Sequence, residues 1–284
     1  MSVLDGNLEP SFKCKYGVSQ GRLTKSEQLQ RFPSEAWQQE FSNASKLGVS
    51  FIELLTEREF NSENPVWSEE GRQEIKDLCL RTGCKTYSLC IDYVINHSLL
   101  DDKDETTLEH VKKAFSAASL LNCKIVIFPL LEASNLLEEN AHKFVPIFKY
   151  LSNEASKYDL KICVESLLKA NELKKFLNLV GHPNVKAVFD TGNRANTSSD
   201  LYSEIVSLGN YVEHVHIKDK NKYGENVILG TGLVDFRSIF SALKKINYAG
   251  ALNFETTRGQ NPLETIRFHI GLCEFFRREV NKDI

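Results

Sequence analysis

The chain has 284 residues, of which 42% are hydrophobic and 26% are charged, and its formal net charge is −3 at pH 7. This composition is ordinary for a globular protein, and the length suits one α/β barrel with a sizeable core. Without a basic excess we expect no nucleic-acid partner, and without an apolar run of about 18 residues we expect no membrane partner.

The cysteines indicate a reducing compartment. The chain has seven, an odd number, and they form no Cys-x-x-Cys pair. Several stand in apolar, strand-like runs, as buried free thiols of cytoplasmic proteins do, so we expect a cytoplasmic protein. The N-terminal residues include Asp5, Glu9 and Lys13 and lack an apolar stretch, so we expect no signal peptide. We interpret residues 1–14 as a polar lead-in and residues 15–284 as the folded domain.

Short apolar runs alternate along the chain with longer segments in which apolar residues recur every three or four positions. The first pattern predicts strands and the second predicts helices. The predicted strands are 16–20, 51–55, 85–90, 124–128, 159–165, 185–190, 211–217 and 250–255. The predicted helices are 34–47, 68–81, 105–121, 137–157, 170–180, 199–208, 235–246 and 262–280. We interpret residues 92–99 as a loop.

Several residues mark the helix ends. Ser34, Ser68 and Asp235 are predicted N-caps, because their side chains can accept a backbone N–H of the first turn. Glycines follow many of the helices, as expected of residues that adopt a left-handed C-cap. Pro146 lies inside a predicted helix and marks a break or kink there.

Strands that alternate with helices predict βαβ units and a parallel sheet. Eight such units over this length favour a closed (β/α)8 TIM barrel in a single domain over an open sheet. No shift in composition marks a second domain. Catalytic groups of such a barrel lie at the C-terminal ends of its strands, so the residues that close each strand are the candidate site residues.

Four of the predicted strands end in a side chain that can bind a metal: Glu165, Asp190, His216 and Glu255. A single such residue is more often a solvated loop residue than a ligand. The prediction of a metal site therefore depends on the occurrence of such residues at the ends of four strands. His214 and His216 alternate with apolar residues, from which we expect one to point into the barrel and the other outward. His216 adjoins the loop and is therefore assigned inward.

Three carboxylates and one imidazole suit a hard divalent cation, namely Mn²⁺, Mg²⁺, Co²⁺ or Zn²⁺. Four protein ligands leave positions at which adjacent oxygens of a sugar can bind. A metal there acidifies the neighbouring C–H because it stabilises the enediolate that deprotonation forms. Glu165 and Glu255, from opposite parts of the barrel mouth, could then remove and return protons. This chemistry is isomerisation or epimerisation.

Other polar groups lie near strand ends or in the following loops. Among them we assign Gln20, Arg22, Glu53 and His97 to substrate binding, whereas Asp92 and Glu132 receive no role. Arg258 binds a phosphate or carboxylate, or is a surface charge. The stretch Gly230-Thr231-Gly232 offers backbone N–H groups to a phosphate, or is only a turn.

Several of these stretches together form a recognisable pattern. They are Val164-Glu165-Ser166, Phe189-Asp190-Thr191-Gly192-Asn193, His214-Val215-His216-Ile217-Lys218-Asp219, Gly230-Thr231-Gly232-Leu233-Val234-Asp235-Phe236 and Asn253-Phe254-Glu255. In them the chain resembles the xylose-isomerase-like barrel superfamily and, within it, the sugar-phosphate isomerases and epimerases. The resemblance implies a TIM barrel and a small carbohydrate substrate. It also implies one divalent metal held by Glu165, Asp190, His216 and Glu255, with Glu165 and Glu255 as the acid/base pair.

The chain departs from this pattern at two places. Asn193 stands where such epimerases often have a histidine; it can bind a substrate hydroxyl but cannot shuttle a proton. Lys222 is a stand-in for an arginine of the strand-seven loop. The AP-endonuclease branch of the superfamily, a DNA phosphodiesterase, needs more histidines, including one at position 193, and a basic face. Two further alternative functions remain open: a metal-dependent sugar or inosose dehydratase, and a degenerate barrel that only binds a sugar. For the assembly, a homodimer or a homotetramer is expected.

Overall fold

The structure of the chain is a computed structural model that describes residues 14–26, 28–101 and 105–282. The predicted lead-in, residues 1–14, lies outside the described residues except for Cys14. No helix in the described ranges has the length and apolar character that a membrane crossing requires.

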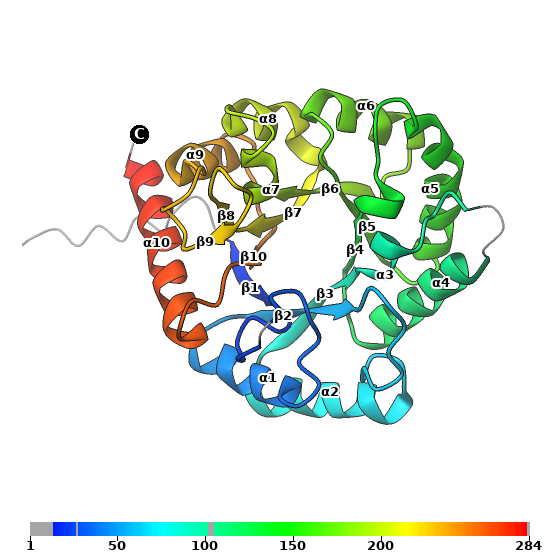
Figure 1. Cartoon of the computed structure of the whole chain (residues 1–284), viewed down its shortest axis with the longest axis horizontal. Helices are drawn as coiled ribbons and strands as arrows, with labels where there is room; N and C mark the ends of the chain where they lie inside the picture. Colours follow the sequence, from blue (N-terminus) through cyan, green and yellow to red (C-terminus); the bar gives the residue numbers. More distant parts are fainter. Residues whose placement is uncertain (1–13, 27, 102–104, 283–284) are drawn as a thin grey trace, which may run out of the picture.

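Eight parallel strands close into a barrel, which confirms the predicted fold class (Figure 1). Neighbouring strands pair in the order β1-β10-β7-β6-β5-β4-β3-β2, and β1 pairs with both β2 and β10 to complete the ring. The strands of the barrel are β1 (Lys15–Ser19), β2 (Phe51–Thr56), β3 (Lys85–Ile91), β4 (Ile125–Pro129), β5 (Lys161–Glu165), β6 (Val185–Asp190), β7 (Val212–Ile217) and β10 (Ala251–Phe254).

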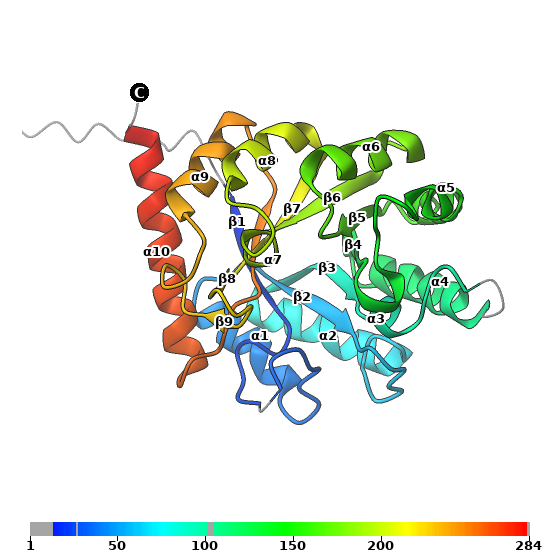
Figure 2. The same ribbon diagram turned by 45° about the horizontal axis from the view of Figure 1, so that its top comes forward.

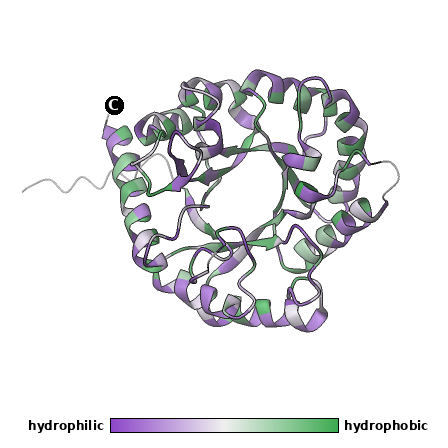
Figure 3. Ribbon diagram, in the orientation of Figure 1, coloured by the Kyte–Doolittle hydropathy of each residue, from purple (hydrophilic) through white to green (hydrophobic). Residues whose placement is uncertain are grey.

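An outer ring of helices covers the barrel (Figures 1 and 2). These helices are α1 (Trp37–Lys46), α2 (Glu69–Thr82), α4 (Glu105–Leu120), α5 (Ala141–Ser156), α6 (Ala170–Val180), α8 (Leu201–Leu208), α9 (Phe236–Lys245) and α10 (Pro262–Lys282). Their inward faces are hydrophobic and their outward faces hydrophilic (Figure 3). The core therefore lies between the strands and the helices, where burial of apolar surface stabilises the barrel.

The predicted helix ends agree with the structure at most positions. Ser68 and Asp235 accept N–H bonds from Gly71 and Ser238, as N-caps do. Ser34 is not a cap: α1 begins at Trp37, and residues 34–36 form a turn instead. The helix α5 starts later than predicted, because residues 137–140 form a turn in which Asn140 Oδ1 accepts the N–H of Leu137. It then continues through Pro146 without a break.

The sequence reasoning did not predict several short elements. The predicted loop 92–99 contains a one-turn helix, α3 (Tyr93–Asn96), and α7 (Thr191–Ala195) follows β6 directly. A small hairpin of β8 (Asp219–Lys220) and β9 (Asn226–Val227) follows β7, and two 3₁₀ turns occur at Glu132–Ser134 and Gly209–Tyr211. These elements are too short for a helical or strand period to register in the sequence.

Candidate active site

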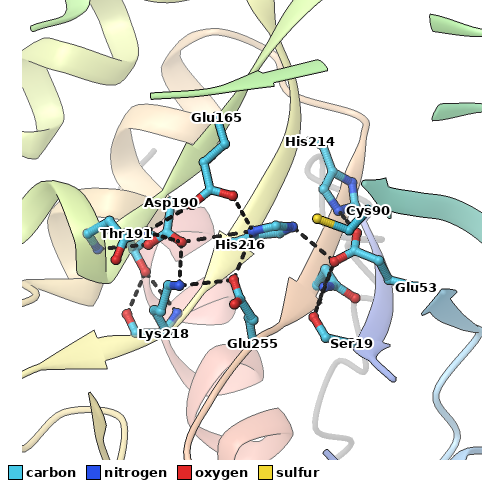
Figure 4. A network of polar contacts seen from close by, with 12 residues as sticks. Ser19, Glu53, Cys90, Glu165, Asp190, Thr191, His214, His216, Lys218 and Glu255 are labelled. Atoms are coloured by element: carbon cyan, nitrogen blue, oxygen red, sulfur yellow. Dashed lines mark hydrogen bonds and ion pairs between the residues drawn. The ribbon is translucent and has the colours of Figure 1, made fainter. Parts of the chain in front are cut away.

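The side chains that close four strands meet at one end of the barrel (Figure 4). Glu165 ends β5, Asp190 ends β6, His216 lies in β7 and Glu255 directly follows β10. One nitrogen or oxygen of each lies within 4.8 Å of those of the others. Parallel strands deliver their C-terminal ends to the same rim, and this is why four residues spread over 91 sequence positions become neighbours.

An imidazole nitrogen lies at the centre of this cluster. His216 Nδ1 is 3.0 Å from an oxygen of Glu255, 3.5 Å from Glu165 and 3.8 Å from Asp190. Neither ring nitrogen of His216 has an aligned hydrogen-bond partner within the described residues, although the residue is only 1% exposed. A buried nitrogen without a partner, surrounded by three carboxylates, is a donor set that fits a hard divalent cation.

Both histidines of β7 point into the barrel, so the expectation that one points outward was wrong. Residues two positions apart on a strand share a face, and the intervening Val215 takes the other. Both rings contact Glu53: His214 Nε2 lies 2.8 Å from one of its oxygens and His216 Nε2 lies 3.0 Å from the other. Figure 4 shows Glu53 on the side of the His216 ring opposite the carboxylate cluster.

Glu53 lines the cavity over the cluster and is also buried among hydrogen-bond donors. Its carboxylate also accepts hydrogen bonds from Ser88 at 2.7 Å and from Asn253 at 2.8 Å. Burial opposes its charge, but His216 and His214 outweigh this effect and hold the pKa of Glu53 well below its usual range. With both oxygens engaged, Glu53 supports the histidines beneath the cluster.

Lys218 is a member of the cluster that the sequence reasoning missed. Its Nζ lies 2.7 Å from Asp190 Oδ2 and 2.9 Å from Glu255 Oε2 (Figure 4). Burial opposes the ammonium charge, yet the two carboxylates raise the pKa of Lys218 above its usual value. The only signal in the sequence is its position, two residues after His216, where the strand ends. Gly192 packs on its stem: a Cβ there would lie 2.6 Å from Lys218 Cγ.

Asn193 and Arg22 reach the cluster from neighbouring loops. The Asn193 amide donates to Glu165 at 2.8 Å and to Asp190 at 3.1 Å. Arg22 is 2% exposed and lies 3.5 Å from Glu255. Its Nε and Nη1 have no hydrogen-bond partner in the described part of the chain. Buried guanidinium N–H groups without partners are available to the oxygens of a ligand.

A cavity of about 250 Å³ opens over the cluster. Its lining includes all members of the cluster except Asp190, together with Asn193, Arg22 and Glu53. It also contains polar side chains to which the sequence analysis gave no role: Gln30, Arg58, Asp92 and Asn226. Asp92 directly follows β3, as the predicted ligands follow their strands, whereas Gln30 and Arg58 stand in loops without any pattern. The volume is smaller than the roughly 300–1,000 Å³ of pockets for drug-sized ligands, which suits a small polar molecule.

Four of the predicted substrate contacts do not line this cavity, namely Gln20, His97, Lys222 and Arg258. The Gln20 side chain accepts the N–H of Leu55, and His97 pairs with Glu59. Lys222 is exposed in the hairpin loop, where its ammonium lies over the ring of Tyr223. Position after a strand was therefore not sufficient, because the direction of each side chain depends on the fold of its loop.

Arg258 has a structural role instead of the predicted contact with an anion. It is 7% exposed and donates to the carbonyl oxygens of Gly21 at 2.6 Å and Leu29 at 2.9 Å. Glu40 binds the same loop from below and accepts the N–H groups of Gly21 at 2.6 Å and Leu23 at 3.0 Å. These two buried charges fix the loop that carries Arg22 to the cavity.

The Gly230-Thr231-Gly232 stretch is a turn around a carboxylate. The N–H groups of Gly230 and Gly232 both donate to Asp219 Oδ2, at 2.9 and 2.8 Å. Asp219 is fully buried. Of the two readings of this stretch, the structure supports the turn, since its donors are already bound.

Comparison with known proteins identifies the family. The L-ribulose-5-phosphate 3-epimerase UlaE of Escherichia coli is 26% identical over 234 residues, which cover 76% of this chain and 80% of that protein. A structure of L-ribulose 3-epimerase superposes with a TM-score of 0.73 at 18% identity, covering 94% of this chain and 97% of the other. A structure of the IOLI protein with a bound zinc atom has a TM-score of 0.71 at 18% identity and covers 94% and 98%. The model of the xylose isomerase-like TIM barrel family matches residues 41–272, so the chain belongs to that family.

Proposed function

We propose that this protein is a divalent-metal-dependent isomerase or epimerase that acts on a sugar or sugar phosphate. The observation that carries the proposal is the convergence of Glu165, Asp190, His216 and Glu255, with ligand atoms within 4.8 Å of one another beneath a small polar cavity. The similarity to sugar epimerases supports the same substrate class.

In this proposal the four side chains hold one divalent ion, Mn²⁺, Mg²⁺, Co²⁺ or Zn²⁺. Such an ion, when bound, supplies Lewis-acid polarisation of a substrate carbonyl and its neighbouring oxygen. The donor set supports a hard cation, because three carboxylates offset its charge and His216 Nδ1 faces all three.

Glu165 and Glu255 are the proposed acid/base pair. They come from β5 and β10, which β6 and β7 separate in the barrel, and they approach the His216 ring at 3.5 and 3.0 Å. One glutamate, as the carboxylate, removes a proton from the carbon beside the substrate carbonyl, and the enediolate then takes a proton from the other glutamate, which gives it as the protonated carboxyl. Return on the opposite face inverts the carbon, and return to the adjacent carbon moves the carbonyl.

Arg22 and Asn193 are the proposed substrate contacts nearest the reacting carbons. Arg22 offers two N–H groups that have no partner among the described residues, and Asn193 already donates to Glu165. Asn193 has no titratable proton at neutral pH, so proton transfer rests on the two glutamates. Lys218, beside Asp190 and Glu255, balances the negative charge of the cluster.

Substitution of the two glutamates tests the proposal. Glu165→Gln and Glu255→Gln each remove a proton-transfer group with little change in shape, and we expect solvent deuterium incorporation into ketoses to fall by at least about a hundredfold. The matched control is Glu213→Gln, which changes a carboxylate of β7 that faces outward and pairs with Lys161. Metal content, measured on the same preparations, separates loss of metal from loss of proton transfer.

The outcomes distinguish the alternative functions. Unchanged deuterium incorporation in both variants would overturn the acid/base assignment. A product lighter by one water would identify a dehydratase. A tightly bound metal without incorporation of label into any sugar of a broad ketose and aldose panel would identify a sugar-binding barrel.

A further inference from the structure

The backbone N–H groups of the glycine-containing turn at residues 230–234, which could otherwise bind a phosphate, are hydrogen-bonded within the chain. The N–H groups of Gly230, Gly232 and Val234 all donate to the Asp219 carboxylate, at 2.9, 2.8 and 3.1 Å. The fit is close, since a Cβ on Gly232 would lie 2.3 Å from an Asp219 oxygen. A phosphate could use these donors only by displacing a buried carboxylate.

The guanidinium at the outer edge of the cavity is also neutralised. Arg58 lines the cavity and forms a bidentate pair with Glu132, with both nitrogens 2.9 Å from carboxylate oxygens. This geometry uses the fork of the guanidinium that a phosphate would need. Glu132 has a strained backbone conformation, with φ of +47°. Such a conformation persists only where the surrounding structure determines it.

The other cations of the described lining lie at the metal-ligand cluster. Arg22 and Lys218 both contact Glu255, at 3.5 and 2.9 Å. A phosphate that reached them would face the carboxylates of the cluster at short range. These cations suit the reacting oxygens of a sugar and do not form a separate phosphate site.

The remaining polar wall of the cavity contains one carboxylate, Asp92, beside the neutral amides of Asn193 and Asn226. Asp92 is 3% exposed; it accepts a hydrogen bond from the Gln30 amide at 2.9 Å and one from the Cys90 thiol at 3.2 Å. Gln30 in turn accepts from Arg22 at 2.6 Å, so Asp92, Gln30 and Arg22 form a fixed chain along the wall. A carboxylate has about four acceptor sites, which leaves Asp92 able to bind sugar hydroxyl groups while it repels an anion.

We propose that the cavity takes a sugar without a phosphate group, and that Asp92 and Gln30 bind the hydroxyl groups that do not reach the metal-ligand cluster. This inference rests on the proposed function of the site and narrows its substrate class to neutral monosaccharides. The Asp92 carboxylate in the wall selects hydroxyl donors. Asp219 binds the backbone N–H groups and Glu132 binds Arg58, so neither set of donors is available to a phosphate.

Paired ligands test this inference on the Mn²⁺-loaded protein. The pairs are L-ribulose with L-ribulose 5-phosphate and D-fructose with D-fructose 6-phosphate, and binding is measured by calorimetry beside deuterium incorporation. The measurement is made at about pH 8, because burial raises the pKa of Asp92 to about 6 and the group is then ionised. In the pair that binds better we expect the free sugar to bind at least about tenfold more tightly than its phosphate.

Two variants should reduce this preference by at least about fivefold. Asp92→Asn removes the charge from the wall and retains its shape. Glu132→Gln releases Arg58 at the cavity edge and acts through a different residue, so it decides the question even if Asp92→Asn does not fold. Asp77→Asn, on the outer helix α2, removes one charge away from the cavity and should leave the preference unchanged.

The outcomes separate this inference from the proposed function. Tighter binding of the phosphorylated sugars, or no binding of either member of any pair, overturns the inference. Binding of the free sugars without deuterium incorporation supports the inference and overturns the isomerase or epimerase function. A preference for free sugars that neither Asp92→Asn nor Glu132→Gln reduces overturns the assignment to this wall.

Discussion

Glu53 Oε1 lies 3.0 Å from His216 Nε2, on the face of the imidazole opposite the three carboxylates of the cluster. When a metal is bound, a carboxylate at Nε2 favours the tautomer with its proton there, and Nδ1, which faces Glu165, Asp190 and Glu255, is the nitrogen left to bind the metal. We therefore propose that Glu53 positions the proposed metal ligand His216, in addition to lining the cavity.

Glu53→Gln should weaken metal binding because the amide no longer fixes this tautomer. We expect the dissociation constant for Mn²⁺ to rise by about 10–100-fold. Chelator competition measures this constant, and thermal unfolding without metal shows whether the variant is folded. Glu213→Gln is the matched control on the outer face of β7. A folded Glu53→Gln variant with unchanged metal affinity would contradict the positioning role.

Lys218→Met should have opposite effects on stability and on metal binding. Without metal, loss of the ammonium leaves Asp190 and Glu255 without their buried cation, and we expect a loss of about 3–5 kcal/mol in unfolding free energy. Metal binding should become at least about tenfold tighter, because a positive charge beside the site is removed.

Denaturant unfolding with and without Mn²⁺, together with calorimetry, checks both effects. Lys161→Met is the control, since this lysine forms a pair with Glu213 on the outside of the barrel at 44% side-chain exposure. Equal stability of the metal-free Lys218→Met variant and the parent would show that the cluster does not need this cation.

Two glycine substitutions should act in opposite directions. Gly192→Ala places a Cβ 2.6 Å from Lys218 Cγ and should cost about 1–3 kcal/mol of unfolding free energy. Gly271→Ala, inside α10, places a Cβ that meets no atom of the described residues within 4 Å, and it should stabilise by about 0.5–1 kcal/mol, since alanine is the better helix former. Urea unfolding of both variants provides the measurement, and destabilisation by Gly271→Ala would refute the packing around α10.

His269 should make the protein less stable in acid. The residue is fully buried; its Nε2 accepts the N–H of Leu229, and burial lowers its pKa to about 4. The unfolded chain, with a histidine pKa of about 6.5, binds more protons between these values. The stability from neutral His269 is thus complete above about pH 6.5, and about 3 kcal/mol is lost as the pH falls to about 4.

His269→Gln keeps an acceptor for Leu229 and has no titratable group, so it should remove this part of the acid dependence. The free energy of unfolding, measured from pH 7 to about pH 4, should fall less in this variant than in the parent by about 3 kcal/mol. His142→Gln, at an exposed position of α5, should retain the dependence of the parent. An identical slope in His269→Gln and the parent would refute the assignment.

The barrel and the four proposed ligands were predictable from the sequence alone. Apolar runs of strand length alternate with amphipathic segments of helix length, and this local pattern repeats eight times, which leaves few architectures open. Glu165, Asp190, His216 and Glu255 each close or follow such a run, so the rule that parallel strands share one functional rim was sufficient to bring them together.

The tertiary structure alone decided what the loop residues do. Arg258 binds two carbonyl groups and Asp219 binds two glycine N–H groups, whereas Lys218, Gln30 and Asp92 enter the cavity. A loop side chain has no period to reveal its direction, because its contacts come from distant segments. Which charges are free for a substrate and which are bound within the fold therefore depends on how those segments pack.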